Sequence, residues 1–192
     1  MRIVGGKWRG RPLNAPEGRN TRPTTDRMRE SLASMILSAY DLDLSDCSVL
    51  DAFAGSGAVG LELLSRGAAH CTFCEGDRRT AGIVRQNCKA LGADPKTWSV
   101  VAGDAFRLPK RGHMDGAPFS LVFLDPPYAM PADDVSRLVA ALDAAGMLAQ
   151  ACNVVYERAL GSNPLDVQGF CRVRGKDRGG TSIDLLSRGG TQ

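Results

Sequence analysis

The chain has 192 residues, of which 43% are apolar and 23% are charged, and its formal net charge at pH 7 is +3. This composition can fill the core of one α/β-sized domain and excludes a disordered chain. No apolar run approaches the roughly 18 residues of a membrane span, and no apolar segment follows Met1, so we expect neither a membrane protein nor a secreted one.

The charge is distributed unevenly along the chain. Residues 1–29 carry eight basic and two acidic side chains, and a second basic cluster lies near the C-terminus. Such clusters attract phosphate backbones through counterion release, so we expect both to contact a nucleic acid, with a merely solvated surface as the alternative. The residues assigned to this contact are Arg2, Lys7, Arg9, Arg11, Arg22, Arg172, Arg174, Lys176 and Arg178.

The N-terminal segment resembles a small hairpin followed by a loop. Residues 3–8 read IVGGKW, and the glycine pair supplies the positive φ that a two-residue turn requires. Residues 14–23 are rich in Pro, Gly and Asn and are typical of a loop. We therefore expect a basic hairpin-and-loop extension over residues 1–23 and a single domain over residues 24–192. Trp8 either stacks on a base or pins the hairpin to the core.

The rest of the chain predicts alternating helices and strands. The first helix, which Thr24 or Thr25 can cap, is indicated by one apolar face made of Met28, Leu32, Met35 and Ile36. Strands are predicted at 48–53, 70–75, 99–102, 120–124, 153–156, 170–174 and 181–187, and further helices at 59–66, 78–91 and 133–145. This order is typical of a mostly parallel seven-stranded α/β sheet that closes with an antiparallel hairpin.

A glycine-rich turn joins the first predicted strand to the following helix. Residues 55–60 match G-x-G-x-x-G, whose glycines allow a ligand to approach the backbone closely. Glu75 lies 18 residues after Gly57, at the end of the second strand, where a carboxylate can accept hydrogen bonds from both ribose hydroxyls. These positions predict a nucleoside-binding crevice at the carboxyl ends of the strands.

Asp51 favours one class of nucleoside cofactor over another. Its carboxylate, at the end of the first strand, would repel a pyrophosphate and attract the ammonium and sulfonium groups of S-adenosylmethionine. The alternative is that Asp51 only caps the local turn. After the third strand, Asp104 can meet the adenine amino group, although Gly-Asp pairs are common in ordinary turns.

The segment Asp125-Pro126-Pro127-Tyr128 directly follows the apolar strand at 120–124. Two prolines end the strand ladder because neither supplies an N–H, and they leave backbone carbonyls available to a ligand. A carboxylate, a carbonyl and an aromatic face together suit a planar base with an exocyclic amine. The amine donates to Asp125 and to the carbonyl of Pro126 while the base stacks on Tyr128, which predicts methyl transfer to nitrogen without a metal.

These motifs resemble those of class I S-adenosylmethionine-dependent methyltransferases, and nearly the whole chain resembles the RsmD family. The segments that carry the family resemblance are MRIVGGKWRGRPL, TRPTTDRMRESL, VLDAFAGSGAVGLELLSRGA and LVFLDPPY. The resemblance implies a Rossmann-like class I methyltransferase fold and methylation of N2 of one guanine, guanine 966 in the usual numbering, of 16S ribosomal RNA. The implied partner is the small ribosomal subunit or its assembly intermediate, and we expect a cytoplasmic monomer.

The resemblance also assigns the site residue by residue. The residues implied to contact the cofactor are Asp51, Ala54, Gly55, Ser56, Gly57, Glu75, Asp104 and Ala105, and those implied to hold the target base are Asp125, Pro126, Pro127 and Tyr128. Residues 21–24 would lie near the mouth of the crevice. Two segments depart from the family pattern: Ala33-Ser34 replaces Phe-Asn, and residues 178–181 replace Tyr-Gly-Lys-Thr.

Three other functions remain open from the sequence. An exocyclic-amine DNA methyltransferase would share the DPPY segment, but the short chain leaves no room for a large target-recognition domain. A nicotinamide-dependent oxidoreductase would share only the glycine turn, and a non-catalytic RNA-binding module would not require the DPPY segment. Zinc is not expected at Cys71 and Cys74, because residues three apart on a strand point to opposite faces. With no signal segment predicted, we expect the chain's six cysteines to be reduced thiols.

Overall fold

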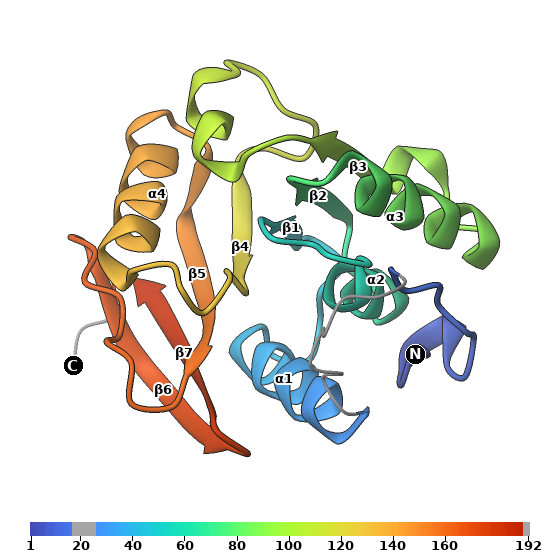
Figure 1. The fold of residues 1–192 in the computed structure, drawn as a ribbon, viewed down its shortest axis with the longest axis horizontal. Helices are drawn as coiled ribbons and strands as arrows, with labels where there is room; N and C mark the ends of the chain where they lie inside the picture. The colour runs from blue at the N-terminus through green and yellow to red at the C-terminus, as the bar shows by residue number, and fades with distance from the viewer. Residues whose placement is uncertain (17–25, 190–192) are drawn as a thin grey trace.

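A computed structural model describes residues 1–16 and 26–189 (Figure 1). In these residues a seven-stranded sheet has the order β3-β2-β1-β4-β5-β7-β6. The strands are β1 (Ser48–Asp51), β2 (His70–Glu75), β3 (Trp98–Ala102), β4 (Phe119–Leu124), β5 (Leu148–Ala159), β6 (Phe170–Arg178) and β7 (Thr181–Arg188). The α-helices are α1 (Asp26–Ala39), α2 (Ala58–Ser65), α3 (Arg78–Leu91) and α4 (Ala132–Ala144), and short 3-10 helices cover Gly6–Trp8, Pro95–Thr97 and Ala105–Lys110.

The sheet is parallel from β3 to β5 and antiparallel at its other edge. Strands β1 to β5 all pair in parallel, whereas β7 pairs antiparallel with β5 and with β6. Side chains of β1 and β4 are almost entirely buried, as expected for strands covered by helices on both faces. The predicted seven-stranded, mostly parallel sheet with a closing antiparallel hairpin is confirmed.

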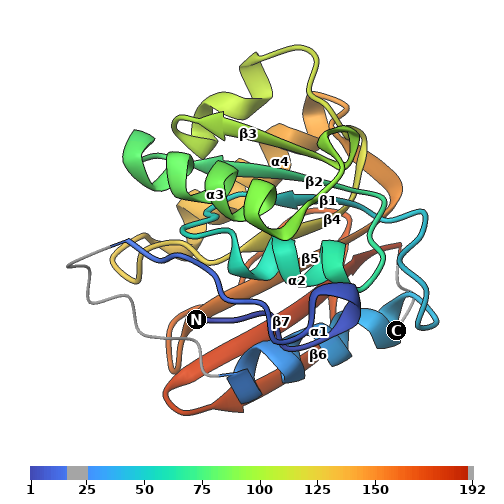
Figure 2. The ribbon, with the colours of Figure 1, turned by 90° about the vertical axis from the view of Figure 1, so that its right-hand side faces the viewer.

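Helices cover both faces of the sheet. Figure 2 shows α1, α2 and α3 on one face and α4 on the other. Two apolar clusters correspond to these faces: residues of α1 to α3 pack against Val49, Phe73 and Phe123, and residues of α4 pack against Leu50 and Leu124. Because neighbouring strand residues belong to different clusters, each strand contributes to both cores, and its last residues reach the rim where the faces meet.

The helical faces predicted from apolar spacing are largely those that become buried. On α1, Leu32, Met35 and Ile36 are buried and Met28 is partly buried. On α4 the apolar residues Val135, Leu138, Val139 and Leu142, which share one helical face, are all buried. On α3 the bounds agree with the prediction, and Val84, Asn87, Cys88 and Leu91 are buried. The capping residues proposed for α1, Thr24 and Thr25, lie outside the described residues.

The N-terminal hairpin differs from the predicted one. Residues 1–13 do fold back on themselves, but the only strand-like pairing among them is the isolated bridge between Arg2 and Pro12, and a 3-10 helix replaces the expected glycine-pair turn. The reason is docking onto the end of α2: a Cβ at Gly6, whose φ is +72°, would lie 1.9 Å from the carbonyl oxygen of Ser65. The Trp8 N–H also donates to Ser65 Oγ at 2.9 Å.

Strand β5 is longer than predicted. The apolar run at 153–156 indicated only its central part, because the preceding residues include the exposed Gln150 and Ala151. Pairing between β4 and β5 shifts register between Phe119 and Leu121, so the first part of β5 pairs separately with the start of β4. Beyond this irregularity the pairing is regular and reaches Leu124 opposite Tyr156, so β5 continues to Ala159 past the end of β4.

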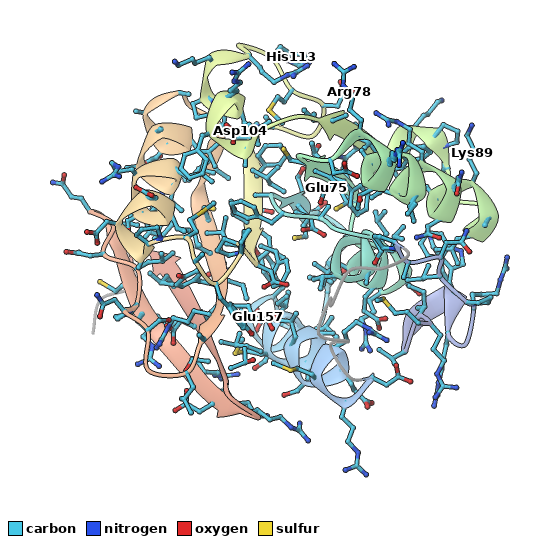
Figure 3. All side chains as sticks on the ribbon, viewed as in Figure 1. Glu75, Arg78, Lys89, Asp104, His113 and Glu157 are labelled. Carbon is cyan, nitrogen blue, oxygen red and sulfur yellow. The ribbon has the colours of Figure 1, made fainter. Side chains whose placement is uncertain are left out.

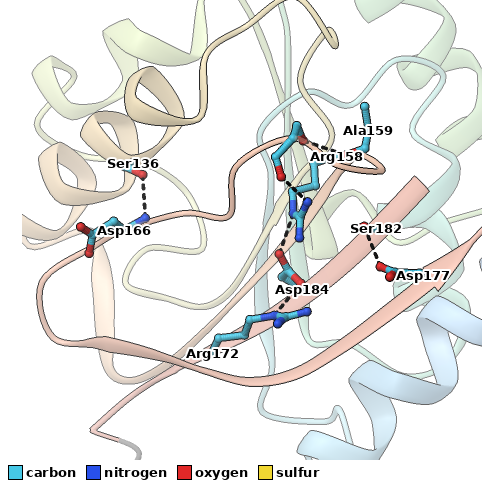
Figure 4. Close-up of polar contacts among 9 residues, drawn as sticks. Ser136, Arg158, Ala159, Asp166, Arg172, Asp177, Ser182 and Asp184 are labelled. Atoms are coloured by element: carbon cyan, nitrogen blue, oxygen red, sulfur yellow. Dashed lines mark hydrogen bonds and ion pairs between the residues drawn. The ribbon is translucent and has the colours of Figure 1, made fainter. Parts of the chain in front are cut away.

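A buried ion cluster holds the C-terminal hairpin to β5 (Figure 4). Asp184 of β7 is 0% exposed and accepts hydrogen bonds from Arg158 Nε at 2.8 Å and Arg172 Nε at 2.7 Å. Arg158 also donates to the carbonyl of Ser162, and Ser182 donates to Asp177 across the β6–β7 pair. Since Arg158 is on β5 and Arg172 on β6, one carboxylate ties three neighbouring strands together.

The chain boundary proposed at residues 23 and 24 falls outside the described residues, so the two-part organisation stays a prediction. Among residues 1–16 and 26–189, no helix is sufficiently long and apolar to pass through a membrane.

Candidate active site

Four carboxylates stand at the carboxyl ends of four adjacent strands. Glu75 ends β2, Asp51 ends β1, Asp125 follows β4 and Glu157 lies near the end of β5. Each comes two residues after a strand residue of the same apolar cluster, so all four belong to the face covered by α1, α2 and α3. We call these residues the acidic row; Figure 3 shows Glu75 and Glu157 on either side of its centre.

The glycine turn has the conformation that its sequence predicts. Gly55 and Gly57 have φ values of +55° and +80°, a region that other residues rarely adopt. A Cβ on Gly60 would lie 2.4 Å from Cε1 of Phe73 and 2.6 Å from Sγ of Cys71. The first two glycines therefore shape the turn, and the third lets α2 pack directly on β2.

Asp51 is buried, and only one of its two carboxylate oxygens accepts a hydrogen bond from the described residues. Its Oδ2 accepts the backbone N–H of Gly60 at 3.1 Å, whereas its Oδ1 accepts no hydrogen bond from any described residue. Burial raises the pKa of this carboxyl to about 7, against the Gly60 hydrogen bond, and the charges of Asp125 and Glu75 raise it further. The turn-capping role is therefore real, and the remaining oxygen fits a cationic ligand donor.

Glu75 is held by the backbone of two turns. Its Oε2 accepts the N–H of Gly55 and its Oε1 accepts the N–H of Asp77, both at 2.8 Å. These bonds fix the carboxylate between the glycine turn and the start of α3. Because each carboxylate oxygen can accept a second hydrogen bond, this arrangement still leaves acceptor capacity for a ribose diol.

The other expected cofactor residues lie around the same turn. Ala54 and Ser56 are each 8% exposed, and the Ser56 carbonyl accepts a hydrogen bond from Asn87 of α3 at 2.9 Å. Asp104 is exposed and caps the 3-10 helix by accepting the N–H of Phe106 at 3.0 Å, and the next residue, Ala105, is buried. The turn reading of Gly103-Asp104 is thus confirmed, and contact with adenine stays a prediction.

The DPPY segment leaves the sheet at the centre of the acidic row. Burial raises the pKa of Asp125 to about 6. The Pro127 carbonyl closes a turn by accepting the Met130 N–H at 2.8 Å. The Pro126 carbonyl is the one assigned to the target amine, and that contact stays a prediction. Tyr128 is 52% exposed, and its hydroxyl lies 3.2 Å from Oγ1 of Thr181. An exposed ring next to a partly buried carboxylate in the chain suits the stacking of a base.

A pocket of about 340 Å³ adjoins this segment. Its walls come from residues 126–133 after β4 and from the end of β5, including Tyr156 and Arg158. Sequence reasoning did not anticipate that the end of β5 lines the site, because this requires the strand order of the sheet. The apolar pattern of β4 and β5 could have indicated the neighbouring strands, but not the positions of their ends.

The predicted basic residues at the N-terminus are only partly available to a nucleic acid. Arg2 pairs with Asp26 at 2.8 Å, and Arg11 donates to the carbonyl of Ala90 at 2.6 Å. Lys7 lies 4.5 Å above the ring of Trp8, whose own burial favours its role in pinning the segment to the core. Arg9 is exposed. Arg22 lies outside the described residues.

The C-terminal basic residues separate into two groups. Arg172 is engaged by Asp184, as described above. Arg174, Lys176 and Arg178 instead line a groove of about 500 Å³ between α1 and β6. Arg27 of α1 lines the same groove, a contribution that the sequence did not reveal, since it depends on α1 packing beside β6. The groove approaches the site, because Arg178 pairs with Thr181, which contacts Tyr128.

The cysteines do not form a metal site in the part of the chain that the structure describes. Cys71 and Cys74 are buried in different apolar clusters, on opposite faces of β2 as expected. No group of three or more His, Cys, Asp or Glu side chains with metal-binding geometry occurs among residues 1–16 and 26–189.

Comparisons with known proteins agree with this architecture. The family model described as "Conserved hypothetical protein 95" matches residues 1–187. The "Ribosomal RNA small subunit methyltransferase D" of Escherichia coli is 41% identical over 128 residues, which are 67% of this chain and 60% of that protein. The "Putative rRNA methyltransferase YlbH" of Bacillus subtilis is also 41% identical over 128 residues, covering 67% of each protein.

Solved structures give the same result over a longer span. The structure named "Putative methyltransferase yhhF from Escherichia coli" has a TM-score of 0.83 and 32% identity, and the match covers 100% of this chain and 99% of that one. A magnesium protoporphyrin IX methyltransferase of Synechocystis, at 18% identity and a TM-score of 0.64, shares the fold alone. The fold is therefore the class I methyltransferase fold. On the family match over residues 1–187 and these similarities, the chain belongs to the RsmD family, whose model is described as conserved hypothetical protein 95.

Proposed function

We propose that the protein transfers a methyl group from S-adenosylmethionine to the exocyclic N2 of a guanine in 16S ribosomal RNA. The observation that supports this most directly is the acidic row, in which the partly unpaired Asp51 lies beside the DPPY carboxylate. Names of relatives that describe ribosomal RNA methyltransferases also support it. Guanine 966, the small subunit or its assembly intermediate, monomeric action and a cytoplasmic location are parts of the same proposal.

The cofactor residues of this chain would each hold a different part of the ligand. Asp51 offers its unpaired oxygen to the ammonium group, and Glu75 accepts from the ribose. Ala54, Gly55, Ser56 and Gly57 border the methionine portion, and Asp104 and Ala105 border adenine. The bound cofactor supplies an electrophilic methyl group on a sulfonium.

Asp125 prepares the target nitrogen for attack. An exocyclic amine is a weak nucleophile because its lone pair is delocalised into the ring. Its N–H groups donate to Asp125 and to the Pro126 carbonyl, which localises the lone pair, while Tyr128 stacks on the base. As the new nitrogen–carbon bond forms, the carbon–sulfur bond breaks, and the excess proton passes from nitrogen to Asp125 or to water. With a pKa of about 6, Asp125 is mostly ionised at neutral pH and can accept this proton.

The basic residues would hold the RNA on the same side as the exposed ring. Arg174, Lys176 and Arg178 offer the groove beside α1, and Lys7 and Arg9 offer a second contact. In this proposal residues 1–23 form an RNA-contacting extension of the catalytic domain at 24–192.

The test is label transfer from methyl-labelled S-adenosylmethionine to small subunits from a bacterial strain that lacks this modification. We expect label at one guanine, located by mass mapping of the RNA, and none with an Asp125→Ala variant that still binds S-adenosylhomocysteine. Duplex DNA in competition tests the DNA methyltransferase alternative, and calorimetry with NADH tests the oxidoreductase. Absence of label in the RNA, or preferential labelling of DNA, would contradict the proposal.

A further inference from the structure

The side chain of Asn87 joins residues 1–14, which we call the N-terminal segment, to the glycine turn. Asn87 lies on α3 and is 1% exposed. Its Nδ2 donates to the carbonyl of Asn14 at 3.0 Å and to the carbonyl of Ser56 at 2.9 Å, and its Oδ1 accepts the N–H of Asn14 at 2.9 Å. Two parts of the chain that are remote in sequence therefore meet on one buried amide.

Ser56 is a residue whose backbone needs such an anchor. It lies between Gly55 and Gly57, and because glycine adopts many backbone conformations, the sequence of the turn does not by itself fix the peptide groups around Ser56. Asn87 holds the Ser56 carbonyl, and the Ser56 hydroxyl donates to Sδ of Met1 at 3.7 Å. The carbonyl and the hydroxyl of Ser56 are thus both held from outside the turn.

The N-terminal segment also docks on α2 through contacts that do not involve the glycine turn. The Val4 N–H donates to Glu62 Oε2 at 2.8 Å. Ser65 Oγ accepts the Trp8 N–H at 2.9 Å and donates to the Gly5 carbonyl at 2.6 Å. Figures 1 and 2 show the segment, in blue, beside α2. Loss of the Ser65 contacts would therefore loosen the same segment without touching the turn.

The chemistry at position 87 requires two donors and one acceptor on a short side chain. A side-chain amide supplies all three, whereas a carboxylate of the same shape supplies only acceptors and would face two carbonyl oxygens. The alternative role for Asn87 is to satisfy buried backbone groups and nothing more. In that case its loss would lower the stability of the fold without changing the affinity for a ligand at the turn.

We propose that Asn87 is a positioning residue for cofactor binding, which fixes the Ser56 carbonyl in the glycine turn and couples the turn to the N-terminal segment. Because coupling between two sites is reciprocal, a ligand at the turn stabilises the docking of Asn14 as much as this docking favours the ligand. The inference rests on the proposed function, since that proposal assigns the glycine turn to S-adenosylmethionine.

Calorimetry with S-adenosylhomocysteine on the full chain measures the effect on affinity. Asn87→Ala removes the bonds to Asn14 and Ser56, and we expect Kd to rise by about 5- to 10-fold. Asn87→Asp keeps the shape of the side chain but lacks both donors, and it should weaken binding by a similar factor. The matched control is Ser65→Ala, which loosens the segment at Gly5 and Trp8 and should change Kd by less than about twofold.

Hydrogen exchange of the wild-type protein tests the coupling without any variant. The amides of Asn14 and Asp166 are matched probes, because each belongs to an exposed residue and donates to a side chain on a helix, Asn87 and Ser136 respectively. Saturating S-adenosylhomocysteine should slow exchange at Asn14 by about fivefold or more and leave Asp166 unchanged. The slowing at Asn14 should persist in Ser65→Ala and disappear in Asn87→Ala.

Steady-state kinetics separate positioning from a general loss of structure. In methyl-transfer assays with saturating small subunits, Asn87→Ala should raise KM for S-adenosylmethionine by the same factor as Kd. Its kcat should change by less than about twofold, because Asp125 and Tyr128 keep their contacts. A variant that is merely less well folded would instead lose kcat through a smaller active fraction.

The outcomes separate this inference from the proposed function. If the wild-type protein binds no S-adenosylhomocysteine, the proposed function is wrong. If it binds the ligand while Asn14 exchanges at an unchanged rate, the coupling is absent and the inference is overturned, a result that requires no variant to fold. Equal weakening by Asn87→Ala and Ser65→Ala, or an Asn87→Ala protein that loses stability with Kd and KM unchanged, would show a purely structural role and would also overturn it.

Discussion

The backbone N–H of Gly60 donates to Asp51 Oδ2 at 3.1 Å, so the glycine that allows α2 to pack on β2 also fixes the buried carboxylate of the site. The second oxygen of Asp51 is directed by this bond but has no partner among the described residues. A single turn therefore links the packing of α2 to the proposed ligand site. Calorimetry can measure ligand binding, and urea denaturation can measure the contribution of the packing to stability.

Ligand binding should release a proton from Asp51. Its pKa is raised to about 7, so about half of the carboxyl groups are protonated at pH 7 in the free protein. The ammonium group of S-adenosylhomocysteine favours the ionised form and should displace about half a proton. Titration calorimetry at pH 7 in phosphate and in Tris should therefore give different heats. Asp51→Asn should abolish this difference and weaken binding, whereas equal heats for the wild-type protein would contradict the assignment.

The rate of methyl transfer should fall at acidic pH. Burial raises the pKa of Asp125 from 3.8 to about 6, so its protonated form accumulates as pH falls through 6, and that form cannot accept both the amine hydrogen bond and the proton. We expect kcat to rise about tenfold from pH 5 to pH 7 and then to level, in single-turnover assays with saturating subunits. Asp125→Asn should lower kcat by about 100-fold or more and remove this pH step while S-adenosylhomocysteine still binds. A wild-type rate independent of pH over this range would count against Asp125 as the acceptor.

Two glycine-to-alanine substitutions in helices should have opposite effects on stability. A Cβ at Gly60 would meet the buried Phe73 ring at 2.4 Å, so Gly60→Ala should lower the free energy of unfolding by about 1–3 kcal/mol. At Gly82 of α3 a Cβ meets nothing within 4 Å, so Gly82→Ala should raise it by up to about 1 kcal/mol. Urea denaturation measures both, and a Gly60→Ala protein as stable as wild type would show that the helix can shift away from β2.

The groove between α1 and β6 should determine the salt dependence of RNA binding. Replacing Arg174, Lys176 and Arg178 together by alanine should raise KM and reduce the slope of log affinity against log salt by about 2, with kcat at saturation unchanged. A control that replaces the exposed Lys89, Lys96 and Lys110 removes the same charge elsewhere. Equal effects of the two triple variants would mean that the groove acts only through net charge.

Most of the fold was predictable because its elements carry their own local signals. The bounds of β2 and α3 follow from an apolar run and from helical spacing, and both agree with the prediction. The predicted conformation of the N-terminal segment was wrong in detail. The observed conformation depends on contact between Gly6 and Ser65, which are remote in sequence.

The residues of the site also differ in whether a local motif or only the tertiary structure reveals them. Asp51, Glu75 and Asp125 could be selected because each directly ends or follows a strand with a recognisable motif. Glu157 lies in a strand without a motif, and only the pairing of β4 with β5 brings it beside Asp125. The sequence likewise did not reveal that Arg27 lines the basic groove, because its position there depends on how α1 packs beside β6.

The acidic row also has a consequence for how a nucleic acid can approach. Four carboxylates along one rim produce a negative potential that opposes the entry of a phosphodiester, while the basic groove nearby attracts it. Under the proposed function, the polyanionic chain would be kept outside, and only an uncharged heterocycle turned out of its stack would reach the site. Charge segregation on this surface would then act as a filter that admits a nucleobase and rejects its backbone.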